Sequence, residues 1–353
     1  MIRIALKTKM YNGGGVVIMS DNVIKNRYEF MVLVEAVMCN PNGDPDMGNL
    51  PRQDMETALG IITDVAIKRR IRNYVQDAEK GLDILMQSGK NLNRDIAEAV
   101  MAATGKETLK GVKKGEKSEQ SQNWLCKKYW DVRTFGGVMA TGRNAGQIKG
   151  AVQVGMATSV DPITVEDMNI TRMCITEQDF DTLKEFDDYS SKIDEDKKRT
   201  MGNKKVVPYG LYVVKGSISA SLAEKNGFTE EDLEMLWESI LQMYNHDVSS
   251  SKTGMSVVSP LIIFKHVGTQ HKNNADDKLR EAKLGCAPAH LLYNLLSIKK
   301  KENIEYPRKY EDYDVSFRAE GVPDGVEVGF KYLPFSEIEW STDGLQNYGI
   351  NVG

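Results

Sequence analysis

The segment Tyr28 to Val37, which reads YEFMVLVEAV, constrains the fold of this chain more than any other. It is rich in Val, Phe and Leu with almost no polar interruption, and such a run is typical of a central strand in a sheet. It ends in a dense group of turn-forming residues, Asn40-Pro41-Asn42-Gly43-Asp44-Pro45. The pattern therefore predicts a central strand that is followed by a tight loop.

Helical and strand patterns alternate after this loop. The predicted elements are a helix from Thr63 or Asp64 to about Glu79, helices over 94–103 and 124–130, a strand over 147–154, a strand from Leu211 to Ile218, a helix from the capping-box sequence at Thr229 to about Asn245, and a strand from Val257 to His266. Without insertions, the order is that of the split βαβ, ferredoxin-like unit, which RNA-recognition motifs share. We therefore predict an α+β fold with a ferredoxin-like (RRM-like) core.

Three segments lie outside this unit. Residues 1–18 lack a clean periodicity, and the triple glycine before Met19 is what a purine-rich ribosome-binding sequence encodes, so we expect Met19 to be the natural start. Residues 105–122 are rich in Lys, Glu, Ser and Gly, which predicts an exposed, mobile insertion. Residues 164–207 predict an arm, because an acidic stretch is followed abruptly by a basic one.

The balance of charges excludes a protein that binds nucleic acid by bulk positive charge. The 353 residues include 46 Lys plus Arg and 50 Asp plus Glu, a net charge of −4, so contact with RNA or DNA must use local clusters of cations. The four cysteines lie far apart, which fits neither a disulfide framework nor a zinc site. No apolar run is long enough for a membrane span. We expect a cytoplasmic chain without membrane, metal or cofactor.

The loop after the first strand allows three interpretations. Its oxygen-bearing side chains alternate as in calcium loops, but Pro45 and Pro51 occupy the positions where an EF-hand needs Gly and Glu. Asx turns that hold a tight loop explain the same residues without a ligand. In the third interpretation, Asp44 or Asp46 assists the cleavage of a phosphodiester.

Two further segments carry candidate phosphate-binding cations. Lys68, Arg69 and Arg72 lie opposite the apolar stripe of their predicted helix, which suits either a solvated face or a phosphate-tracking one. Residues 133–150 combine glycines with three cations but match neither the Walker A nor the dinucleotide pattern, so single-strand binding and a plain loop both stay open. The histidines are isolated and no nucleophile elbow occurs, so nothing marks a hydrolase.

The run RYEFMVLVEAVMCNPNGDPDMGNLPRQD, followed by TDVAIKRRIRNYV, closely resembles the opening of a CRISPR-associated Cascade backbone subunit. The subunit that it resembles is that of the type I-C (Dvulg) subtype, which belongs to the Csd-two, or Cas-seven, family of RAMP proteins. Further matches are DVRTFGGVM, GAVQVGMATSVDPI, MGNKKVVPYGLYVVKG and LGCAPAHLLY. The resemblance covers about residues 27–330, and its Asn-Pro-Asn-Gly-Asp-Pro motif is quite specific.

This resemblance implies both an organisation and a set of partners. The implied organisation is an N-terminal extension over 1–26, a palm over 27–330 with a loop at about 40–62, a helical finger region at 81–130 and a thumb arm at 160–208, and a C-terminal tail over 331–353. In this family, copies line up head to tail along a crRNA and grip its backbone, while a thumb displaces a base at regular intervals. The implied partners are crRNA, target DNA through the guide, further copies in a helical filament, other Cascade subunits and a recruited helicase-nuclease.

The resemblance also implies which residues contact RNA. Those carried over by position in the matching motifs are Asn40, Asn42, Arg52, Lys68, Arg69, Arg72, Arg133, Arg143, Lys149, Gln153, Lys204, Lys205, Tyr209, Ser251 and Lys252. Tyr209 is expected to stack beside a displaced base at the thumb. The others are expected to shape the loop or follow the phosphate backbone.

We therefore predict a non-catalytic scaffold that binds guide RNA in antiviral defence. The alternative is a metal-dependent ribonuclease that uses Asp44 or Asp46, as an Asp in the equivalent loop of related type III subunits does. Processing of the guide precursor is less favoured, because the sequence lacks a convincing His or Lys–Tyr constellation.

Overall fold

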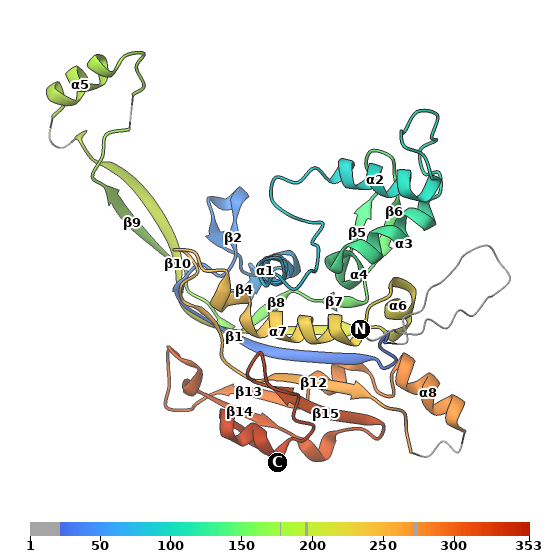
Figure 1. The fold of residues 1–353 in the computed structure, drawn as a ribbon. Helices are drawn as coiled ribbons and strands as arrows, with labels where there is room; N and C mark the ends of the chain where they lie inside the picture. Colours follow the sequence, from blue (N-terminus) through green and yellow to red (C-terminus); the bar gives the residue numbers. More distant parts are fainter. Residues whose placement is uncertain (1–21, 177, 195–196, 271–273) are drawn as a thin grey trace.

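A single large sheet lies at the centre of the computed structural model, which describes residues 22–176, 178–194, 197–270 and 274–353 (Figure 1). Its strands run in the order β15-β12-β1-β10-β8-β4, with β7, β9 and β11 paired to its members. The bounds are β1 (Tyr28–Cys39), β4 (Leu59–Ile62), β7 (Val152–Val154), β8 (Ala157–Pro162), β9 (Glu166–Arg172), β10 (Thr200–Ile218), β11 (Met255–Val257), β12 (Leu261–His266) and β15 (Val326–Lys331). The fold is thus a mixed α/β one.

Strand β1 occupies the middle of this sheet, as the sequence predicts. It pairs antiparallel with β10 along nearly its whole length, from Tyr28 opposite Ile218 to Cys39 opposite Val207. On its other side it pairs antiparallel with β11 and β12. Both neighbours are therefore non-local in sequence, although the strand itself is recognisable from ten consecutive letters.

Both faces of β1 are buried, which explains its nearly continuous apolar sequence. Helices α1 (Asp64–Asp77) and α7 (Glu230–His246) cover one face, where Phe30 packs edge-to-face on Trp237. A second sheet of β13 (Leu296–Lys300), β14 (Tyr313–Phe317) and β16 (Ile350–Val352) covers the other, where Met31 and Leu33 pack. The segment predicted as a C-terminal tail thus contributes β16, whose Ile350 is fully buried.

The two covering helices begin where their capping residues predict. The Thr63 side chain accepts a hydrogen bond from the Ala66 amide at the start of α1. Thr229 and Asp232 form the predicted reciprocal capping box at the start of α7. These local signals fix both helix starts to within a residue of the predicted position.

The predicted strand over 147–154 is wrong, because it is interrupted at Gly150 and forms two separate strands. Residues before it form β6 (Gly146–Lys149), which pairs with β5 (Gly136–Met139), and residues after it form β7 in the central sheet. A Cβ on Gly150 would lie 2.2 Å from the backbone carbon of Phe135, so two chain segments cross here at a distance that only glycine permits.

The predicted finger region contains more helix than the sequence indicates. Its helices are α2 (Leu92–Thr104) and α3 (Ser118–Lys128), and α4 (Trp130–Phe135) begins at its last residue. The last residues of the predicted insertion at 105–122 belong to α3, and Ser121 is fully buried. The first part of the insertion has no regular secondary structure, and its lysines are exposed.

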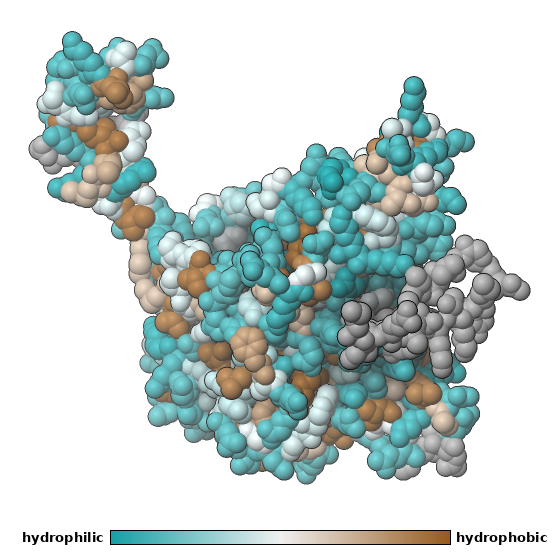
Figure 2. All heavy atoms as spheres, in the orientation of Figure 1, coloured by the Kyte–Doolittle hydropathy of each residue, from teal (hydrophilic) through white to brown (hydrophobic). Residues whose placement is uncertain are grey.

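The predicted arm projects from the body as a two-stranded ribbon of β9 and the first part of β10, with α5 (Leu183–Lys192) beyond it (Figure 1). Helix α5 buries none of its residues. Figure 2 shows hydrophobic side chains on the arm among hydrophilic ones, and exposed members include Ile170, Leu183 and Met201.

The remaining elements connect these layers. They are β2 (Gly43–Asp44), β3 (Leu50–Pro51), α6 (Ala220–Asn226), α8 (Ala275–Leu284), α9 (Ala289–Tyr293) and the short 3-10 turns at 45–47, 310–312, 319–321 and 343–348. Within the described ranges, every helix is too short or too polar to traverse a bilayer. Met19 lies outside the described residues. The predicted extension over 1–26 is described only from residue 22, and Ile24 is buried in the core.

Candidate nucleic-acid interface

The loop that follows β1 is tied to the loop before β11 by main-chain and side-chain hydrogen bonds. The Asn40 amide donates to the Ser251 carbonyl at 2.9 Å, and the Asn40 side chain donates to the Asn49 carbonyl at 2.8 Å. Asn40 is only 3% exposed. It therefore shapes the loop, as predicted, but its own side chain faces the protein.

Lys252 adds a side-chain connection between the same two loops. Its Nζ donates to the carbonyls of Asn40 at 2.6 Å and Pro41 at 2.7 Å. Desolvation by burial, together with the nearby positive charge of Arg70, lowers the pKa of Lys252 to about 8. Among the described residues, no carboxylate lies within ion-pair distance of this ammonium group, so the two carbonyls are its stabilising partners.

Asn42 joins the same loop to helix α1. Its Oδ1 accepts hydrogen bonds from the Thr63 amide at 2.8 Å and the Thr63 hydroxyl at 2.9 Å. Its carbonyl accepts from the Arg52 amide, and the Arg52 guanidinium pairs with Asp44 at 2.9 Å. The Asn-Pro-Asn-Gly-Asp motif is therefore used, in this chain, to hold its own turn against α1.

The base of the arm reaches the same place. Lys204 on β10 donates from Nζ to the Ser250 carbonyl at 2.9 Å. Hydrogen bonds thus connect predicted RNA-binding residues from four separate segments of the chain. We call this set the loop-40 cluster: Asn40, Asn42, Arg52, Lys204, Ser251 and Lys252.

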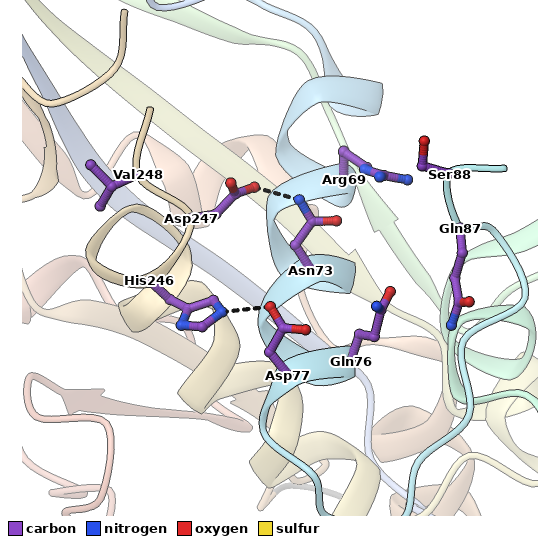
Figure 3. A pocket seen from close by; sticks show the side chains of 9 residues that line it. All are labelled: Arg69, Asn73, Gln76, Asp77, Gln87, Ser88, His246, Asp247 and Val248. Atoms are coloured by element: carbon purple, nitrogen blue, oxygen red, sulfur yellow. Dashed lines mark hydrogen bonds and ion pairs between the residues drawn. The ribbon is translucent and has the colours of Figure 1, made fainter. Parts of the chain in front are cut away.

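A polar cavity of about 260 Å³ lies between α1 and the end of α7 (Figure 3). Its lining residues are Arg69, Asn73, Gln76, Asp77, Gln87, Ser88, His246, Asp247 and Val248. Asn73 donates to Asp247, and His246 is hydrogen-bonded to Asp77 at 2.8 Å. Of the predicted residues, only Arg69 faces this cavity, where its guanidinium makes a long 3.4 Å contact with the Met86 carbonyl.

Two predicted cations are tied to buried carboxylates and are only slightly exposed. The Arg72 Nε lies 2.8 Å from Asp131, which is fully buried and also accepts from the amides of Leu85 and Met86. The Arg133 guanidinium makes two hydrogen bonds to Asp232. Their placement does not support the predicted role of either arginine in an RNA groove.

The placement of Tyr209 does not support the prediction that it stacks beside a displaced base, which stays a prediction. Its side chain is only 7% exposed and packs on Tyr313 with nearly parallel rings, on the face of the sheet that the C-terminal strands cover. Burial first, and then the charge of Glu35, raise the pKa of the Tyr209 hydroxyl far above its ordinary value. Tyr209 therefore packs mainly within the protein, although it also lines a cavity of about 430 Å³ with Asp161 and Arg308.

The other predicted residues are dispersed. Lys68 pairs with Asp64 on α1, and Lys205 pairs with Asp167 across the arm ribbon. The remaining three are Arg143 and Lys149 on the β5–β6 hairpin and Gln153 on β7. Lys149 and Gln153 are exposed, and Arg143 donates to the Val112 carbonyl.

Sequence reasoning missed Arg70, which the structure places beside the loop-40 cluster. Its guanidinium pairs with Asp247 at the end of α7, at 2.7 Å. It directly follows Lys68 and Arg69 in the sequence. Its position around the helix relative to those two residues was the sequence signal that could have identified it.

The acidic residues of the loop do not form a metal site with their neighbours. One Asp44 oxygen pairs with Arg52 and the other accepts from the Asp46 amide. Across the described part of the chain, no group of three or more His, Cys, Asp or Glu side chains could hold a metal ion.

A family model described as CRISPR-associated protein Cas7 matches residues 26–318 of the chain. A curated protein of Haloferax volcanii, named CRISPR-associated protein Cas7, is 26% identical over 240 residues, which span 65% of this chain and 67% of that protein.

Two solved structures are also similar to the chain. One, described as a CRISPR RNA-guided surveillance complex, pre-nicking, has a TM-score of 0.44 and 14% identity over 74% of this chain and 84% of its own. Another, described as a CRISPR RNA-guided surveillance complex, has a TM-score of 0.37 and 14% identity over 74% and 77%. Since both TM-scores are below 0.5, the family assignment rests on the family model.

Proposed function

Because the chain belongs to the CRISPR-associated Cas7 family, we propose that it is the crRNA-binding backbone subunit of a Cascade surveillance complex of the type I-C subtype. It holds the guide by its sugar-phosphate backbone and leaves the bases free to pair with target DNA. The subunit itself is not a nuclease, and a recruited helicase-nuclease cleaves the target.

The observation that carries this proposal is the loop-40 cluster. Lys204 and Lys252 both donate to backbone carbonyls, so that no carboxylate within the cluster neutralises their charge. Uncompensated cations beside a rigid loop are suited to a phosphate, whose position carries no sequence information. The location also suits a long ligand, because the arm leaves the body at this point.

The strand arrangement supports a ferredoxin-like palm. Strands β12, β1, β10 and β7 lie side by side and antiparallel, with α1 and α7 on one face. This is the order 4-1-3-2 of a βαββαβ unit, in which β1 is the first strand and β12 the fourth. On this proposal, β9, α5 and the start of β10 form the thumb, and α2 to α4 belong to the fingers.

Several copies bind one guide in this proposal. An arm that buries nothing of its own helix is suited to contact a second copy, and a head-to-tail contact that does not close generates a helical filament. The complex acts in the cytoplasm, with the other Cascade subunits at the ends of the filament.

A charge-reversal experiment tests RNA binding. Lys204→Glu combined with Arg143→Glu should lower the affinity for single-stranded RNA and flatten its dependence on salt. Lys283→Glu on α8 is the matched control, at a site away from the cluster. Unchanged RNA affinity of the double variant at several salt concentrations would show that RNA binds elsewhere.

The alternative, a metal-dependent ribonuclease, depends on Asp44 or Asp46. Asp46 is the more accessible of the two, because both oxygens of Asp44 have partners within the loop. Incubation of the purified chain with RNA and magnesium tests it. Cleavage that disappears in Asp44→Asn or in Asp46→Asn would establish the ribonuclease in place of the scaffold.

A further inference from the structure

We propose that Lys252 is a positioning residue: its ammonium group holds the Asn40–Pro41 turn in the conformation that receives a phosphate of the guide, without touching the guide itself. This inference rests on the proposed RNA binding. It differs from the sequence-based prediction, in which Lys252 was a direct contact to the RNA backbone.

The geometry gives Lys252 its role. Both of its hydrogen bonds, at 2.6 and 2.7 Å, end on the consecutive carbonyls of Asn40 and Pro41. The Asn40 amide donates to the Ser251 carbonyl, so residues 251–252 hold both the N–H and the C=O of Asn40. Charge-assisted hydrogen bonds of this kind are about twice as strong as neutral ones, and the turn they hold continues into Asn42 and the start of α1.

Among the described residues, the charge of Lys252 is stabilised by two carbonyls and not by an ion pair, and burial outweighs the nearby Asp247 in lowering its pKa. An ammonium group taken partly out of water without an adjacent carboxylate destabilises the folded state. The surrounding groups are Cys39 on β1, Arg70 on α1, Lys204 on β10 and Asp247 after α7. Asp247 is engaged by Arg70 and Asn73, and burial raises the pKa of Cys39 to about 11, so Cys39 stays neutral near pH 8.

An anion that docks on the turn supplies the missing compensation. Because the pKa of Lys252 is lowered to about 8, the group loses its proton at moderately alkaline pH in the free protein. Between this value and the ordinary lysine pKa, the unfolded chain binds more protons than the folded one, so this group makes the protein more stable as pH rises. RNA affinity changes in the opposite direction, because the charge that holds the turn is lost.

The test compares RNA affinity and amide exchange from about pH 7 to pH 9.5 at constant ionic strength. The RNA is a short single strand of adenosine and cytidine, whose bases do not titrate in this range. Wild-type affinity should fall about ten-fold across this interval. Lys252→Met should bind weakly with a flat profile, and Lys252→Arg should regain part of the affinity and keep it at high pH. Lys278→Met, on the exposed face of α8, should behave as wild type.

Two results overturn the inference. One is an identical pH profile for wild type and Lys252→Met, because the titrating group would then lie elsewhere. The other is unchanged hydrogen exchange of the Asn40 amide in Lys252→Met, because the turn would not depend on the lysine. The exchange measurement needs no RNA, so an absence of RNA binding by the wild type refutes the proposed function while exchange still decides the positioning role.

Discussion

Arg133 and Asp232 join α4 to the first turn of α7 through two hydrogen bonds, from Nε at 2.8 Å and from a terminal nitrogen at 2.7 Å. The side chains are only 12% and 4% exposed. Asp232 also belongs to the capping box of α7. A cation that a sequence motif assigned to RNA is thus a fixed link between α4 and α7.

Arg133→Met should therefore destabilise the protein rather than weaken its RNA binding selectively. Removal of one partner leaves a buried carboxylate without compensation, which costs about 3–5 kcal/mol. Urea unfolding measures the loss, and a double-mutant cycle with Asp232→Asn isolates the pair. If the folded Arg133→Met protein kept its stability but lost RNA affinity, the arginine would be an RNA contact after all.

A pair of adjacent lysines on β10 should have different effects on RNA binding. Lys204→Ala removes a charge that no carboxylate of the described residues neutralises, so the slope of log affinity against log salt should fall by about 0.7. The control replaces Lys205 and its partner Asp167 together by Ala, which leaves the net charge unchanged. Equal slopes for the wild type and Lys204→Ala would place this cation outside the interface.

Gly254 allows the close approach of two backbone segments beside the loop-40 cluster. A Cβ at this position would lie 1.7 Å from the Val37 carbonyl oxygen, and the Val37 amide donates to the Gly254 carbonyl. Gly254→Ala should therefore lower stability by about 3 kcal/mol. Gly155→Ala, where the nearest atom is 3.8 Å away, should cost almost nothing, and urea unfolding of both variants checks the contrast.

Glu35 on β1 should make the protein less stable as pH rises through its titration. Burial first, and then the charges of Glu311 and Asp312, raise the pKa of its carboxyl group. The folded state therefore holds this proton more tightly than the unfolded state, so the stabilising contribution exists at low pH and is lost above the folded pKa.

Glu35→Gln should accordingly be more stable than the wild type near pH 7, and the difference should shrink towards pH 4. Urea unfolding at several pH values provides the measurement, with the exposed Glu302→Gln as control. A variant that is less stable than the wild type at every pH would mean that the carboxylate is needed for its bond from the Tyr310 amide.

Local patterns account for the parts of the fold that were predicted correctly. The apolar run of β1 predicts burial on both faces, and the threonines at 63 and 229 predict helix starts. Each of these signals depends only on residues that are neighbours in the sequence. The strand over 147–154 was wrong because an alternating pattern does not reveal that Gly150 lies where two segments cross. The C-terminal layer was missed because its short strands carry little periodicity.

The partners of the cations could not be predicted from one sequence. Arg72 and Asp131 are separated by 59 residues, and Arg133 and Asp232 by 99, so no spacing rule relates them. Motif membership identified Arg133, but only the packed structure distinguishes a cation held by a buried carboxylate from one held by a carbonyl. The members of the loop-40 cluster were each predicted as RNA contacts, which stays a prediction; that they come together in one place was not predicted.

Strand β10 runs without interruption for 19 residues, from the arm into the centre of the body, which corresponds to roughly 60 Å of extended chain. Its outer part is paired only with β9, whereas its inner part is fixed against β1. The outer and inner parts of this strand meet beside Lys204, where its pairing changes from β9 to β1. Because the strand is continuous, a displacement of the arm by a ligand or a second copy is transmitted through β10 to the loops that Lys204 and Lys252 hold.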